Sequence, residues 1–101
     1  MNILAISVTR QAGGLTLSLK PMVRRILHAE FPEAAIIPSI FVAHTAQQSE
    51  SDVLTRLAKY LVPALTGLTQ EQLVAGTTQI LFMDTSNGHL LGEFSPSNVA
   101  A

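Results

Sequence analysis

The stretch that decides the fold is Thr78–Phe94, TQILFMDTSNGHLLGEF, in which two apolar runs flank the dipeptide Asn87-Gly88. Asn-Gly between two such runs favours a β-hairpin with a two-residue type I′ turn, because both central residues of that turn need positive φ. Direct pairing across the turn would place Ser86 opposite His89. We therefore predict a hairpin at the C-terminal end of the chain.

The first strand of this hairpin contains four consecutive apolar residues, Ile80 to Met83. Neighbouring side chains in a strand alternate between faces, so Ile80 and Phe82 would lie on one face and Leu81 and Met83 on the other. The helices of the chain can cover only one of these faces. We therefore expect the other face to contact protein, through an interface made of Leu81, Met83, Leu90 and Phe94.

Alternation and proline placement predict the elements of the N-terminal third. Residues Ile3 to Thr9 alternate as a strand, and Gly13-Gly14 marks a loop. Leu15 to Leu19 also alternates, which favours a second strand; a helix capped by Ser18 is the alternative. A helix over Pro21 to Glu30 follows, with its proline in the first turn, where the missing N–H costs nothing.

The middle of the chain predicts one strand and one long helix. The strand covers Ala34 to Ala43, and it must lie at a sheet edge or carry a bulge because Pro38 cannot donate to a ladder. Ser49 or Ser51 is the expected N-cap of the helix. That helix should kink or end near Pro63, which removes one hydrogen bond and crowds the preceding turn.

Thr69-Gln70-Glu71-Gln72 matches a capping box and predicts a short helix just before the hairpin. The element order is strand, second strand, helix, strand, two helices and two strands. The predicted fold class is α+β: a single-domain, two-layer sandwich with a mixed sheet of four or five strands and two main helices on one face. We expect this domain to cover residues 1–94 and a flexible tail to cover residues 95–101.

Composition limits the function classes. Of the 101 residues, 48% are hydrophobic and only 13% are charged, against about 25% charged in ordinary soluble domains. The net charge is −1 with six lysines and arginines in total, which disfavours nucleic-acid binding because phosphates need a basic footprint.

Without cysteine there is neither a disulfide framework nor a thiolate zinc site. The first eight residues lack a basic n-region and a long apolar run, so we expect no signal peptide or membrane span and a cytoplasmic protein.

Arg10, Gly13 and Gly14 form the first candidate ligand site. A glycine-containing loop after a strand can hold an anion with its backbone N–H groups, and a nearby guanidinium would add charge. The loop matches no established phosphate-binding motif. Two glycines in a hairpin loop explain the pattern as well.

Asp84, Ser86 and His89 form the second candidate ligand site, since these residue types can serve as orienter, nucleophile and base. Polar residues also gather at exposed turns for conformational reasons, and a hairpin tip provides no oxyanion hole. We therefore assign no catalytic residue. The three histidines lie on different elements without metal-ligand spacing, so no metal site and no cofactor are expected.

The function that these patterns favour is a non-catalytic protein–protein interaction or assembly domain. Low charge, high apolar content and a sheet with two apolar faces indicate self-association through one face, as a homo-oligomer or as part of a larger protein complex. The alternative is a small ligand-binding protein or enzyme whose site forms at a subunit interface.

Overall fold

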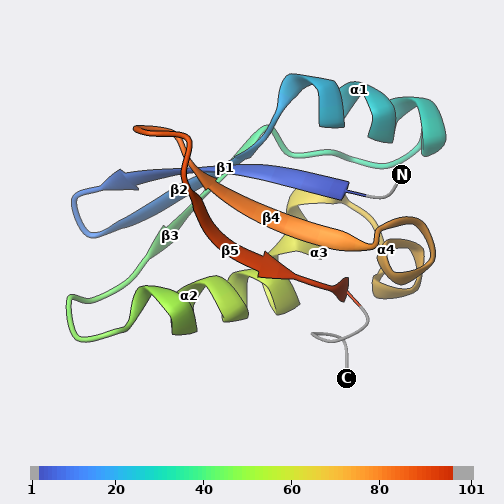
Figure 1. Ribbon diagram of the computed structural model, residues 1–101. Helices are drawn as coiled ribbons and strands as arrows, with labels where there is room; N and C mark the ends of the chain where they lie inside the picture. The colour runs from blue at the N-terminus through green and yellow to red at the C-terminus, as the bar shows by residue number, and fades with distance from the viewer. Residues whose placement is uncertain (1–2, 97–101) are drawn as a thin grey trace.

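The computed structural model describes residues 3–96. Its helical elements are α1 (Pro21–Glu30), α2 (Glu50–Arg56), the π-helical turn η1 (Leu57–Leu61), α3 (Val62–Thr66) and α4 (Gln70–Gly76). Its strands are β1 (Ile3–Gln11), β2 (Gly14–Leu19), β3 (Ser39–Ala43), β4 (Gln79–Asp84) and β5 (Leu90–Phe94). Within the described residues the strands form one mixed sheet in the order β3-β2-β1-β4-β5, with β1 and β4 parallel (Figure 1). The predicted α+β fold class is confirmed.

One face of the sheet, called here the first face, forms the core. The pairings of Val8 with Leu17 and of Ile6 with Phe82 place the buried side chains of β1, β2 and β4 on this face. The buried residues of the helices, such as Leu27 of α1 and Leu54 of α2, belong to the same core cluster. The opposite face, called the second face, has no fully buried large side chain among the paired residues.

The N-terminal hairpin is confirmed, and Leu15 to Leu19 is strand rather than helix. Strand β1 extends to Gln11 before Gly13 turns the chain with φ 80°. Alternation continues until Leu19, whose side chain is buried. Strand β2 then leads directly into α1, which has Pro21 at its first turn as predicted (Figure 1).

Strand β3 is shorter than the predicted Ala34 to Ala43, because it begins only after Pro38. The segment before it packs on α3 instead of joining the sheet: the Ile37 N–H donates to the Leu65 carbonyl at 2.9 Å. This contact fixes the segment away from β2. Of the two predicted alternatives, a sheet edge or a bulge at Pro38, the structure has the edge: β3 is an edge strand, and Pro38 lies just before it.

The predicted helix in the middle of the chain begins after Ser49, and its hydrogen-bond pattern changes just before Pro63, as the sequence predicts. The Ser49 hydroxyl accepts the Asp52 N–H at 3.1 Å as an N-cap. Around Pro63 the helix widens into η1, in which the Val62 N–H donates to the Leu57 carbonyl five residues back. A wider turn suits a residue that lacks an N–H and crowds the carbonyl four positions before it.

Two further end signals of the helices are confirmed. Gly67 ends α3 in the left-handed conformation, with φ 69°. Thr69 and Gln72 form the predicted capping box at the start of α4, with hydrogen bonds of 3.2 and 2.9 Å.

The C-terminal hairpin is present, but the predicted two-residue turn is wrong. In the loop between β4 and β5 only Gly88 has positive φ, at 73°, so Asn87 does not take the type I′ conformation. The Gly88 N–H donates to the Asp84 carbonyl and the Asp84 N–H donates to the His89 carbonyl, each at 2.8 Å. The Asp84 carboxylate also accepts the Ser86 N–H, which winds the chain into a longer loop. Ser86 therefore does not pair with His89.

A β-bulge in this hairpin changes which side chains share a face. Phe82 pairs with Gly92 and Met83 pairs with Leu90, which leaves Leu91 without a partner across the ladder. Simple alternation would place Leu90 and Phe94 on one face. Because of the bulge, Leu90 lies on the second face, whereas Phe94 lies on the first face and packs edge-on against Phe82, with ring centroids 5.7 Å apart.

The predicted tail, residues 95–101, lies outside the described residues from position 97 onward. Among residues 3–96, no helix has the length and apolar character needed to cross a bilayer.

Candidate functional site

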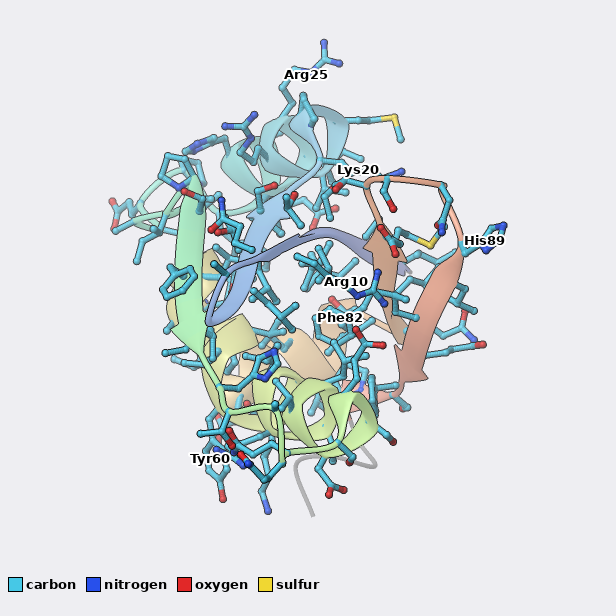
Figure 2. All side chains as sticks on the ribbon, turned by 90° about the vertical axis from the view of Figure 1, so that its left-hand side faces the viewer. Arg10, Lys20, Arg25, Tyr60, Phe82 and His89 are labelled. Atoms are coloured by element: carbon cyan, nitrogen blue, oxygen red, sulfur yellow. The ribbon has the colours of Figure 1, made fainter. Side chains whose placement is uncertain are left out.

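Arg10 and Asp84 come from the two candidate sites, and the parallel pairing of β1 with β4 brings them together. Val8 lies beside Asp84 in that ladder, and Arg10 lies two residues further along the same face of β1. The Arg10 Nη1 forms an ion pair with the Asp84 Oδ2. Figure 2 shows Arg10 near Phe82, on the side of the sheet that faces α2.

Glu50 completes this cluster from the first turn of α2. Its Oε1 accepts the Arg10 Nε–H at 3.0 Å and lies 2.8 Å from the Arg10 Nη2. One guanidinium therefore connects β1, β4 and α2. Because arginine presents its donors in a planar fork, it can bind two carboxylates at once and fix the orientation of α2 on the sheet.

The Asp84 carboxylate is buried, with 3% of the residue exposed, and accepts hydrogen bonds from Ser86 and Arg10. Its Oδ1 accepts the Ser86 hydroxyl at 2.7 Å and the Ser86 N–H at 2.9 Å. These hydrogen bonds, together with Arg10, lower the pKa of Asp84 to about 2 although burial acts in the opposite direction. The carboxylate is therefore ionised at neutral pH.

Ser86 and His89 do not form a catalytic relay with Asp84. In such a relay the imidazole lies between the hydroxyl and the carboxylate, whereas here the Ser86 hydroxyl donates directly to the carboxylate. His89 is exposed, and Figure 2 shows its side chain directed outward from the hairpin. Its backbone N–H donates to the Asn87 Oδ1 at 2.9 Å, a local turn contact.

Gly13 and Gly14 serve the β1–β2 hairpin and its contact with β3. The Gly13 carbonyl accepts the His44 N–H at 3.0 Å. A Cβ at Gly14 would overlap the Val42 carbonyl oxygen and lie 2.9 Å from the Ala43 Cα, so only glycine allows β3 to approach here. The Arg10 guanidinium is directed to its two carboxylates, so the structure does not bring it together with this loop as an anion site.

The Arg10–Asp84 cluster is suited to holding elements together rather than to chemistry. Two carboxylates surround one guanidinium, and the hydrogen bond with Asp84 is the main cause that raises the pKa of Arg10. An added anion would meet net negative charge. A groove of about 480 Å³ lies elsewhere, between the α1–β3 connection and α4, where Glu30, Phe31, Leu68 and Gln72 are among its lining residues.

No group of three histidine, aspartate or glutamate side chains in residues 3–96 is arranged to hold a metal ion. Sequence reasoning missed Glu50 as a partner of Arg10. Its place in a helical first turn gives an electrostatic reason for its charge, but the contact with Arg10 depends on how α2 lies across the sheet.

The second face carries the other predicted site residues. Leu81 pairs with Ala5, Met83 pairs with Leu90, and Ile3 lies two residues before Ala5 on the same face of β1. These five residues, Ile3, Ala5, Leu81, Met83 and Leu90, are called here the apolar band. Ile3 and Leu90 are about half exposed, at 48% and 50%, and Leu81 and Met83 are partly exposed.

Comparison of the chain with protein-family models, with curated proteins and with solved structures found no significant match.

Proposed function

We propose that this chain is a non-catalytic assembly domain that self-associates through the second face of its sheet. The observation that supports this proposal is the apolar band, which extends over three adjacent strands. Its outer members, Ile3 and Leu90, remain about half exposed in the single chain. Contiguous exposed apolar patches on small proteins are typical of protein interfaces.

The margin of the band has the character of an interface rim. Glu93 pairs with Leu81 across the β4–β5 ladder, and its carboxylate accepts a hydrogen bond from the Gln79 side chain. On another margin, next to Met83, Ser7 of β1 and its partner Ser18 of β2 carry small polar side chains. An apolar centre with a hydrogen-bonded polar margin is the usual composition of a protein interface.

The alternative function, a small ligand-binding protein or enzyme, has less support. The Arg10 guanidinium is already engaged by two carboxylates, and Ser86 donates its hydroxyl to one of them. A ligand at this place would have to displace charge-assisted hydrogen bonds that join three elements.

A charge within the band tests the proposal. We expect Met83→Asp to lower the solution mass measured by light scattering, because a carboxylate would have to be desolvated in the interface. Val74→Asp is the matched control, since Val74 is 43% exposed but lies on α4, away from the band. Circular dichroism checks that both variants fold. An unchanged assembly in Met83→Asp would overturn the proposed surface.

A further inference from the structure

The outer edge of β3 presents a regular set of backbone groups. The hydrogen bond from the His44 N–H to the Gly13 carbonyl fixes which residues of this strand face β2. In an antiparallel ladder the hydrogen-bonded pairs alternate, so Val42 and Ile40 also direct their backbone groups to β2. The N–H and C=O groups of Ser39, Phe41 and Ala43 therefore point away from the sheet. Figure 2 shows β3 at the margin of the sheet.

This edge lacks the usual protection against strand pairing. Natural edge strands carry charges, bulges or prolines that prevent another strand from adding. The opposite edge strand, β5, has both a bulge and Glu93. By contrast, the chain contains no charged residue between Glu33 and Glu50, and Pro38 precedes β3 without interrupting it.

We propose that β3 pairs antiparallel with β3 of a second copy of this chain, around a two-fold axis at Phe41. The proposal rests on the proposed function in taking a second copy as the partner, and it adds the sheet edge as a contact surface. The three outward residues are evenly spaced about Phe41, so the axis pairs Phe41 with Phe41 and Ser39 with Ala43. Every outward N–H then faces an outward carbonyl, as a two-fold interface requires.

The side chains of the two copies are compatible on both faces of the proposed β3–β3 pairing. On the second face Phe41, which is 53% exposed, would contact Phe41 of the second copy. On the first face Ile40 would lie opposite Val42 of the second copy, and both are partly buried apolar residues packed against the core. Such aromatic and β-branched cross-strand pairs stabilise sheets. The joined sheet leaves each apolar band open for the association described above.

Opposite charges at the two-fold axis give the decisive test. We expect Phe41→Lys and Phe41→Glu each to lower the solution mass in light scattering to that of the assembly joined by the apolar band alone, because like charges would lie opposite each other in the β3 pairing. An equimolar mixture of the two variants should restore the wild-type mass by pairing one variant with the other, and native mass spectrometry resolves these mixed assemblies. Tyr60→Lys and Tyr60→Glu are the controls, since Tyr60 is 62% exposed on η1. Failure of the mixture to reassociate would overturn the pairing.

A proline at an outward position tests the hydrogen bonds directly. Ala43→Pro removes an N–H that points away from β2, so the β2–β3 ladder stays intact while the β3–β3 pairing loses donors. We expect Ala43→Pro to lose the β3 contact and to show a lower solution mass, and Ala43→Thr, which keeps the N–H, to retain the wild-type mass. If Met83→Asp dissociates the assembly while the Phe41 variants do not, the proposed function stands and the β3 pairing is wrong. The reverse result would assign self-association to β3 instead of the apolar band.

Discussion

Replacement of Gly67 by alanine tests how the segment before β3 is fixed. Gly67 has φ 69°, and a Cβ there would lie 2.7 Å from the Ala35 carbonyl oxygen. Gly88 is the matched control, because it has φ 73° and no atom within 4 Å of the corresponding Cβ position. The two substitutions share the conformational penalty and differ in the steric one.

The expected magnitudes follow from these two contributions. Alanine in the left-handed region costs about 1–2 kcal/mol, partly offset by about 0.4–1 kcal/mol from a less flexible unfolded chain. Gly88→Ala should therefore lower the free energy of unfolding by roughly 0–1.5 kcal/mol. Gly67→Ala adds overpacking against backbone, about 1–3 kcal/mol, for a total of roughly 1–4.5 kcal/mol.

Urea unfolding followed by circular dichroism measures both values. Each kcal/mol of destabilisation corresponds to a Tm lower by about 4–8 °C in a chain of this length. Equal destabilisation by Gly67→Ala and Gly88→Ala would refute the reasoning, since it would show that Ala35 does not press on Gly67.

Two further predictions concern the charged cluster and the core. Because the pKa of Asp84 is lowered from 3.8 to about 2 in the folded chain, its stabilising contribution is complete above the unfolded pKa and is lost as the pH falls through the folded one. Asp84→Asn should therefore make the free energy of unfolding less dependent on pH between about 5 and 2; an unchanged slope in acid titrations of both proteins would contradict this. Phe82→Ala should reduce the free energy of unfolding by about 3–5 kcal/mol, because Phe82 is fully buried and packs on Phe94. A loss below about 1 kcal/mol in urea unfolding would show that this position is not in the core.

Local signals in the sequence predicted much of the fold. The alternation at Leu15 to Leu19, the proline at position 21, the capping box at Thr69 and the stop at Gly67 all act within a few residues, and each appears in the structure. Such signals depend on the backbone preferences of the residues themselves. They are therefore visible without knowledge of the tertiary structure.

The predictions of local structure fail where contacts with distant or buried groups determine the backbone conformation. The segment before Pro38 has strand-like composition, but the contact between Ile37 and Leu65 holds it on α3. Asn87-Gly88 favours a type I′ turn, but the buried Asp84 carboxylate draws in the Ser86 N–H and lengthens the loop. In both cases a hydrogen bond to a distant or buried group outweighs a local preference.

The candidate site shows the same limit. Nothing local indicates that β1 and β4 are parallel neighbours, yet that pairing alone brings Arg10 to Asp84 and away from the Gly13-Gly14 loop. The bulge at Leu91 likewise separates Leu90 from Phe94, because one unpaired residue reverses the alternation of faces. Leu81, Met83 and Leu90 lie together on the second face, whereas Phe94 lies on the first face and packs against the core.

The mass of the wild-type chain in solution, measured by light scattering over a concentration series, tests self-association most directly. The monomer has a mass of 10.8 kDa. We expect a dimer or larger assembly that persists on dilution and is reduced by Met83→Asp but not by Val74→Asp. A mass of one chain at every concentration would contradict self-association through the sheet.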